Sequence, residues 1–158
     1  MWNTSNVTSM QEMFTESRFQ GEISEWDVSK VTNMYAVFDH SKFNGNISNW
    51  DVSNVTDMAY AFNHSQFTGD LSKWDVSNVR DMQGMFKNSQ FNGDISSWNV
   101  SNVMDFHLMF EQSPFRGDIS SWEISQEAEV EAFCTSVKAF DFSTIPALSL
   151  RVHDIFPN

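Results

Sequence analysis

The sequence predicts an α/β repeat solenoid of 24-residue coils, in which short parallel strands alternate with short helical segments. All of its tryptophans recur at intervals of 24 residues, at Trp2, Trp26, Trp50, Trp74, Trp98 and Trp122. Their neighbours recur with them, so that WDVSNVTDMAYAFNHSQFTGDLS is followed by WDVSNVRDMQGMFKNSQFNGDIS. A fixed period of this length is typical of solenoids, in which each coil packs only on its neighbours.

Each 24-residue coil is numbered from its tryptophan as position 1, and the predicted strand surrounds that tryptophan. Between Ile47 and Val52 apolar and polar residues end in strict alternation, which is a strand signal. Trp50 and Val52 then face inward, and Asp51 faces outward. Equivalent strands joined by a crossover must pair in parallel.

A short helix and a glycine turn are predicted to complete each coil. Four residues of the second coil share one face of a helix: Met34, Val37, Phe38 and Ser41. Phe43-Asn44-Gly45 then turns the chain, and we expect Gly45 to take a positive φ, which glycine adopts at little cost. The phenylalanines at positions 13 and 18 are expected to form two interior columns.

Five 24-residue repeats and a sixth strand are predicted over residues 1–125. Residues 126–158 are predicted to form a C-terminal capping segment that begins with a helix over residues 126–140, because apolar side chains, including Cys134, recur there at helical spacing. The first coil begins at once at Trp2. We therefore expect one of two situations: the natural chain lacks an N-terminal cap, or the sequence is part of a longer chain. The second is the favoured interpretation. Neither a signal peptide nor a membrane span is recognised.

Composition narrows the classes of partner. The formal net charge is −12, which disfavours nucleic acid and anionic membranes, because both attract Lys and Arg. Cationic partners or divalent ions are favoured instead. The single cysteine, Cys134, excludes an intrachain disulfide, so that stability must come from packing.

The coil pattern I-x-x-W-x-V-S-x-V-x-x-M-x-x-M-F-x-x-S-x-F, which runs from Trp2 to about Ser125, resembles the BspA-like leucine-rich repeats of bacterial surface proteins. It is most similar to the 26-residue-repeat surface lipoproteins among them. The resemblance implies a leucine-rich-repeat-like solenoid at the cell surface or outside the cell, with a role in adhesion or host contact. It carries over no catalytic residue.

An outward row of aspartates is the first candidate site. Asp27, Asp51 and Asp75 share position 2, and strands stacked in register would place them about 4.8 Å apart. Oxygen-rich, carboxylate-lined sites suit Ca²⁺, so these three are candidate calcium ligands. The alternative is that each carboxylate is solvated or bonds a neighbouring serine. A second acidic row after the glycines is predicted to bond local backbone N–H groups: Glu22, Asn46, Asp70, Asp94 and Asp118.

Two histidines share position 15 of adjacent coils and are expected to lie close together. His40 and His64 could bind a metal, although no third ligand is evident beside Asp39 and Asn63. The alternative is a solvated position that varies among the coils.

Side chains that vary among the coils mark a candidate binding surface. Positions 10, 11, 14, 15, 17 and 24 change from coil to coil, and they include Tyr35, Tyr60, His40, His64, Lys42 and Lys87. Most are expected on the outer side of the helical segment or its following loop. The face with the Asp and Ser rows is the other candidate, and the sequence does not separate the two.

These observations predict a non-enzymatic recognition or adhesion module that binds a protein or glycan partner through its solenoid surface. The alternative is a structural protein that self-associates through its first coil, where Trp2, Val7, Met10 and Phe14 would expose an apolar patch. No nucleophile–base pair is apparent in the sequence, and no cofactor is predicted apart from the possible Ca²⁺.

Overall fold

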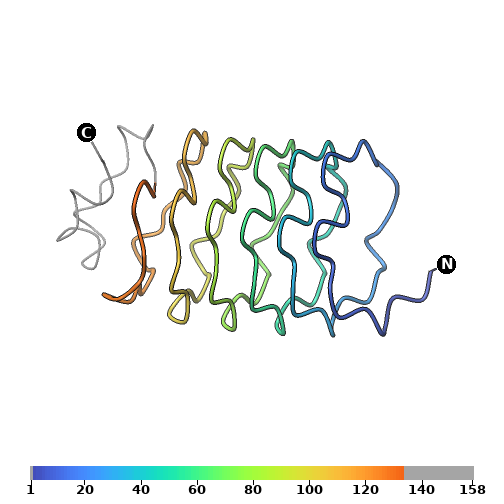
Figure 1. The fold of residues 1–158 in the computed structure, drawn as a ribbon, viewed down its shortest axis with the longest axis horizontal. Coiled ribbons are helices and arrows are strands. Elements are labelled where there is room, and N and C mark those ends of the chain that lie inside the picture. The colour runs from blue at the N-terminus through green and yellow to red at the C-terminus, as the bar shows by residue number, and fades with distance from the viewer. Residues whose placement is uncertain (1, 134–158) are drawn as a thin grey trace.

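The computed structural model describes residues 2–133 as an array of stacked coils (Figure 1). The coils succeed one another along the long axis in chain order, from the N-terminal end to Phe133. Parallel pairing joins residues that are 24 apart, as between Asn33 and Asp57. The predicted repeat solenoid with 24-residue coils is therefore confirmed.

The predicted alternation of helices and strands is wrong for the described residues. Between residues 2 and 133 the chain forms no α-helix and no strand longer than a single bridge residue. Its β-structure is one column of isolated parallel bridges at position 8, made by Ser9, Asn33, Asp57, Asp81, Asp105 and Glu129. This column begins the segment for which the sequence predicts a helix.

The segment from position 9 to position 15 pairs with the next coil instead of with itself. Alternate N–H groups donate to carbonyls of the following coil. In the second coil the bonds run from Met34 to Asp57, Ala36 to Ala59, Phe38 to Ala61 and His40 to Asn63, at 2.8–2.9 Å. The intervening N–H groups close turns within their own coil, as Val37 does on Met34 at 3.2 Å. These bonds provide the backbone partners that a helix would otherwise supply. We call this segment the ladder.

Two positions of the ladder adopt a left-handed backbone among the described residues. Position 11 has a positive φ in Glu12, Ala36, Tyr60, Gly84, Leu108 and Ala132, and position 15 in Glu16, His40, His64, Asn88 and Gln112. A left-handed conformation costs a non-glycine residue about 1–2 kcal/mol. Bonds to neighbouring coils hold these residues in place, so the cost is offset by the array and not by the residue type.

Turns replace the predicted strand around each tryptophan. The Trp50 N–H donates to the Ile47 carbonyl at 3.1 Å, and the Val55 N–H donates to the Val52 carbonyl at 2.9 Å. The predicted directions are nevertheless confirmed, because Trp50 and Val52 are buried and Asp51 is exposed. Alternating burial is therefore produced here by consecutive turns.

The glycines at position 20 make room for a ring and do not supply a positive φ. A Cβ added to Gly45 would lie 2.7 Å from Cζ of Phe43, which is fully buried. Gly84, at position 11, has the only positive φ found among the described glycines. The predicted left-handed conformation of Gly45 is therefore wrong, because close ring packing selects glycine there.

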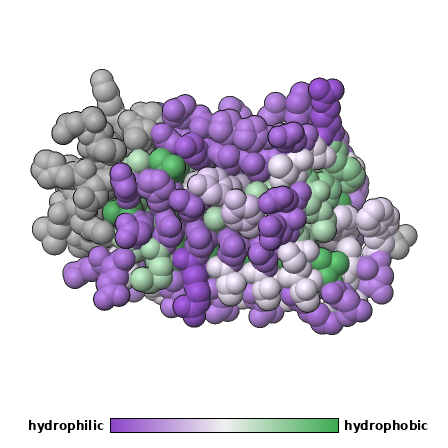
Figure 2. All heavy atoms as spheres, in the orientation of Figure 1, coloured by the Kyte–Doolittle hydropathy of each residue, from purple (hydrophilic) through white to green (hydrophobic). Residues whose placement is uncertain are grey.

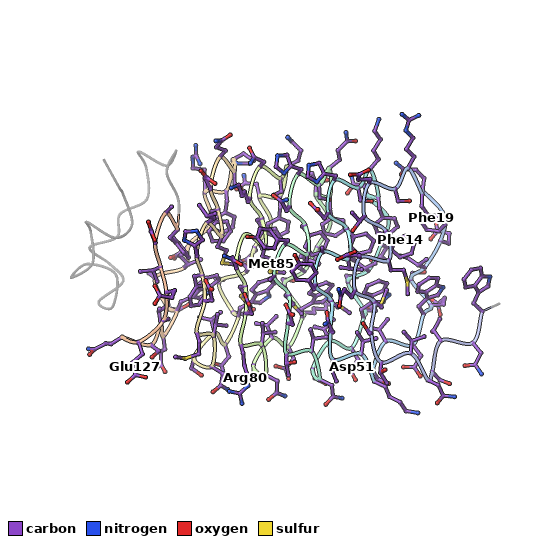
Figure 3. The ribbon with its side chains drawn as sticks, in the orientation of Figure 1. Phe14, Phe19, Asp51, Arg80, Met85 and Glu127 are labelled. Carbon is purple, nitrogen blue, oxygen red and sulfur yellow. The ribbon has the colours of Figure 1, made fainter. Side chains whose placement is uncertain are left out.

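Aromatic columns run through the core, as predicted. The rings of Phe38 and Phe62 are stacked with centroids 5.5 Å apart, and those of Phe62 and Phe86 with centroids 5.6 Å apart. The second column brings Phe43 and Phe67 to 6.5 Å. Met85 is fully buried near the middle of the array (Figure 3).

The predicted capping helix is wrong over the part that is described, residues 126–133. Glu129 forms the last bridge of the column with Asp105. The Phe110 N–H donates to the Phe133 carbonyl at 2.8 Å, and Ala132 has the left-handed φ of position 11. The sixth coil thus continues the ladder. The rest of the predicted cap, with Cys134, lies outside the described residues.

Residues 2–133 contain no helix that is long and apolar enough to cross a bilayer.

Candidate binding face

The ladder carries the side chains that differ most among the coils. Its backbone bonds repeat from coil to coil at nearly constant lengths, whereas the outward residues change in size and charge. We call the exposed and partly buried side chains at positions 10, 11, 14 and 15 of the second and third coils, with the Asp row at position 8, the variable face. Its main members are Tyr35, Asp39, His40, Asp57, Tyr60, His64, Asp81 and Asp105.

Two predicted binding residues meet on this face. The rings of Tyr35 and Tyr60 lie edge to face with centroids 6.0 Å apart, and both side chains are partly buried. Tyr60 extends over Gly84 of the next coil, where an added Cβ would lie 2.6 Å from its Cε1. Burial raises the pKa of the Tyr60 hydroxyl, and the nearby Tyr35 and Asp105 raise it further. Tyr60 therefore stays neutral and offers both a ring edge and a hydroxyl.

The two predicted histidines also meet. The rings of His40 and His64 are stacked with centroids 4.2 Å apart and planes 10° from parallel. Nδ1 of His40 lies 2.8 Å from Oδ1 of Asp39, and Nδ1 of His64 lies 2.9 Å from Oδ1 of Asn63. Burial, followed by the neighbouring His40, lowers the pKa of His64. The pair is thus held in a fixed arrangement by its own coils.

A row of half-buried aspartates is a feature that the sequence analysis missed. Asp57, Asp81 and Asp105 share position 8, and each Oδ1 accepts the backbone N–H two residues ahead at 2.8–3.0 Å. Burial raises the pKa of Asp81, and Asp105 and Asp57 add to the rise against the lowering effect of the Gln83 N–H. The sequence carries a signal for this row, namely three aspartates at one position of consecutive coils, directly before the segment for which a helix is predicted.

A salt bridge balances part of the charge beside this face. Nζ of Lys87 lies 2.6 Å from Oε2 of Glu111 in the next coil. Both residues occupy position 14, so the bridge runs along the array. Among residues 2–133, no lysine or arginine forms an ion pair with the carboxylates of Asp57, Asp81 and Asp105, and the face is acidic.

The aspartates at position 2 lie apart from the variable face. Asp51 points outward along one edge of the array, together with Arg80 and Glu127 (Figure 3). Oδ1 of Asp27 accepts the Ser29 hydroxyl at 2.6 Å, and Asp51 accepts that of Ser53 at the same distance. These bonds to serine lower the pKa of Asp27.

Asp75 follows the same rule, since hydrogen bonds from Ser77 lower its pKa. The interpretation of the position 2 row as locally bonded carboxylates is confirmed, and calcium binding stays a prediction.

The second acidic row is also locally bonded. Asp70, Asp94 and Asp118 accept the N–H groups of Ser72, Ser96 and Ser120 at 2.8–2.9 Å.

An apolar surface lies at the N-terminal end of the array. Trp2 is 79% exposed, Met13 is 44% exposed and Phe19 is 37% exposed. They line a hollow of about 460 Å³ together with Phe14 and Trp26. Figure 2 shows apolar side chains gathered at this end, whereas polar ones cover much of the remaining surface in view. Phe14 and Phe19 face one another there, with centroids 5.2 Å apart (Figure 3).

The composition of this patch differs in part from the prediction. Trp2 is exposed as expected, and Val7 is partly buried. Met10 and Phe14 are buried, because their own coil and the next one cover them. Met13 and Phe19 take their place at the surface.

The repeats of this chain match a known protein family. Two overlapping segments, residues 1–89 and 39–145, match the model of a family described as Mycoplasma protein of unknown function, DUF285. Searches among curated proteins and among solved structures found no match. Because the two matched segments together span most of the sequence, the chain belongs to the DUF285 family.

Proposed function

We propose that this chain is a non-enzymatic recognition module whose variable face binds a protein partner. The observation that carries the proposal is the contrast within the ladder. Its backbone and core are repeated from coil to coil, while its outward side chains are not. Repeat scaffolds bind through surfaces of this kind, because the frame keeps its shape while individual residues change.

The chemistry of the face favours a partner with a basic surface. Half-buried tyrosines are among the side chains that contribute most to protein interfaces, and Tyr35 and Tyr60 form one rigid pair. Asp57, Asp81 and Asp105 lie along the same ladder, and the whole chain carries a net charge of −12. A positive partner would be attracted and oriented by this charge. Anionic glycans would be repelled, which makes a protein the favoured partner and a neutral glycan the alternative.

The resemblance to BspA-like leucine-rich repeats supports the biological setting. It suggests a surface or extracellular protein with a role in adhesion, and we extend that role to this member of the DUF285 family. An extracellular partner with exposed Lys and Arg fits both the resemblance and the charge.

Matched variants test which face binds. The immobilised chain is presented to an array of basic extracellular proteins and to a glycan array. The double variant Tyr35→Gln/Tyr60→Ala uses residues that the chain itself carries at these positions, namely Gln11 and Ala36. We expect it to weaken binding of a protein partner at least about tenfold, the loss expected for a hot-spot residue.

The control is Asp27→Asn/Asp51→Asn/Asp75→Asn, because position 2 already holds Asn3 and Asn99. This triple variant should bind as the wild type does. Loss of binding in the control but not in the tyrosine variant would show that the partner binds the aspartates at position 2 and not the variable face. Binding to glycans alone would contradict the choice of partner.

Assembly through the N-terminal end is a second candidate function. It is favoured by the exposed Trp2, Met13 and Phe19 and by the hollow between them. A coil of the same kind, from a second copy, would bury these side chains as Phe38 and Phe43 are buried further along. Sedimentation velocity at several concentrations should then show mass rising with concentration, and Trp2→Ser/Met13→Ser should abolish the rise. A monomer at every concentration would contradict assembly.

A further inference from the structure

We propose that His40 and His64 form a binding site for a divalent transition-metal ion such as Zn²⁺, with Asp39 as its supporting carboxylate. One donor atom from each of the three residues can be chosen so that all lie within 4.8 Å of one another. The two imidazoles come from the same position of adjacent coils. The three residues belong to the variable face, but the metal site is argued from its own geometry and does not require protein binding.

The ladder fixes the separation of the two histidines. The His40 N–H donates to the Asn63 carbonyl at 2.8 Å, and the His64 N–H donates to the Lys87 carbonyl at 2.8 Å. Both residues have a left-handed φ, of 53° and 51°, so their Cα–Cβ bonds leave the coil in the same direction. The stacked rings, with centroids 4.2 Å apart, follow from this equivalence. The pair is therefore organised by the backbone before any ligand arrives.

Hydrogen bonds at Nδ1 leave both Nε2 atoms as metal donors. The Asp39 carboxylate can only accept, so Nδ1 of His40 carries a proton and donates to it at 2.8 Å. Nδ2 of Asn63 donates to the same Asp39 oxygen at 2.8 Å, which directs Oδ1 of Asn63 toward Nδ1 of His64. In its neutral form each ring therefore holds its lone pair on Nε2.

This is the arrangement in which histidines usually bind metals, with the second ring nitrogen donating to a carboxylate or a carbonyl. Asp39 anchors both rings, His40 directly and His64 through Asn63. The negative charge of Asp39 also offsets part of the charge of a cation bound nearby.

The geometry suits a small ion with an affinity for imidazole. Zn–N bonds are about 2.0–2.1 Å long, so both rings must tilt toward one another from their stacked arrangement before both Nε2 atoms can bind one ion. The His40 side chain is 48% exposed, which leaves room for that tilt and for water as the further ligands. Imidazole donors suit Zn²⁺, Ni²⁺ and Cu²⁺, whereas Ca²⁺ takes oxygen ligands.

Isothermal titration of the full chain, produced without a histidine tag, tests the site with Zn²⁺ and with Ca²⁺ as the comparison ion. The variants are His40→Asn and His64→Asn. Asn88 occupies the equivalent position with a φ of 53°, so asparagine fits the backbone there. We expect one Zn²⁺ per chain, at least tenfold weaker binding in each single variant and no comparable binding of Ca²⁺. Circular dichroism melts confirm that the variants fold.

His107→Asn is the matched control, because His107 lies at position 10 and outside the cluster. It should leave Zn²⁺ binding unchanged. Asp39→Asn keeps an acceptor for Nδ1 of His40 and removes the charge, so it should weaken binding less than loss of either histidine. Absence of Zn²⁺ binding in the wild type, or equal binding in His40→Asn/His64→Asn, would overturn the proposal.

Discussion

The carbonyl oxygen of Ile47 accepts two hydrogen bonds that belong to different coils. The backbone N–H of Trp50 donates to it at 3.1 Å within one turn, and the indole Nε1 of Trp74 donates to it at 3.1 Å from one period further along the chain. The indoles of Trp50, Trp98 and Trp122 make the equivalent bond to the carbonyl 27 residues earlier. The tryptophan spacing thus reflects a requirement for a ring that both fills the core and donates across the coil boundary.

Replacement of this donor should weaken the array. Trp74→Phe removes the bond to Ile47, which contributes about 0.5–1.5 kcal/mol, and the smaller ring leaves a cavity that adds to the loss. Urea denaturation measures the change in the free energy of unfolding. Trp2→Phe is the control, since Trp2 is 79% exposed and makes no indole bond to a described residue. Equal losses in both variants would contradict a specific role for the buried indole of Trp74.

The glycines at position 20 should tolerate alanine only at the exposed end. In Gly69→Ala the new Cβ would lie 2.6 Å from Cζ of Phe67, a fully buried ring that cannot move away. Overpacking of this kind costs about 1–3 kcal/mol. Gly21→Ala places a Cβ equally close to Phe19, but that ring is partly exposed and can shift. Thermal melts should therefore show a lower melting temperature only for Gly69→Ala. An unchanged melting temperature in that variant would show that glycine is not needed at position 20 to make room for the ring.

A column of buried serines is predicted to stabilise the turn after the ladder. The Ser65 hydroxyl accepts the Phe67 N–H at 3.1 Å, and both residues are buried. Ser65→Ala would leave that N–H without its acceptor, at a cost of about 1–3 kcal/mol. In the first coil Ser17 bonds the Phe19 N–H at 3.0 Å in an exposed setting, where water can replace the hydroxyl. Chemical denaturation of Ser65→Ala and Ser17→Ala should show a large loss only for the former.

Asp81 and Asp75 should respond to charge removal in opposite directions. The pKa of Asp81 is raised in the fold, chiefly by burial, so the folded state keeps its proton to a higher pH than the unfolded state. The resulting stabilisation is full below the ordinary pKa and is lost as pH rises through the raised one. Asp81→Asn should therefore stabilise the protein at pH 7, by a few tenths to about 1 kcal/mol, with the gain vanishing near pH 3.

Asp75→Asn is the comparison. Bonds from Ser77 lower the pKa of Asp75, so its contribution is present above the ordinary pKa and is lost as pH falls through the lowered one. This variant should be less stable than the wild type at pH 7 and equal to it in strong acid. Asparagine suits both turns, as Asn33 and Asn99 show. Stability curves that do not converge at low pH would contradict the assignment.

The period, the core and the outward rows could be predicted from the sequence, because each depends on which side chains recur. The hydrogen bonding could not. Met34, Val37, Phe38 and Ser41 fit one face of a helix, but the same spacing fits a series of turns that pairs with the next coil. Residue type does not mark the left-handed positions, since position 11 is filled by Glu12, Ala36 and Tyr60. Contacts between coils impose that backbone.

The candidate metal site could likewise be predicted in part. Shared positions predicted that His40 and His64 would meet, and the structure brings them together. The role of Asp39 as an anchor depends on a side-chain direction that spacing does not reveal. The row of Asp57, Asp81 and Asp105 is not predicted, because it depends on parallel bridges where the sequence indicates the start of a helix.

The ladder bonds also give the array a direction. In each coil the N–H groups at positions 9, 11, 13 and 15 point toward the following coil, so the carbonyls of Ser9, Gln11, Met13 and Thr15 face the N-terminal side. If two copies packed around a two-fold axis at that end, the carbonyl oxygens of one ladder would face the carbonyl oxygens of the other, and no N–H group would stand opposite them. A neighbour that continues the ladder must therefore approach head to tail, and such contacts extend into filaments unless they close into a ring.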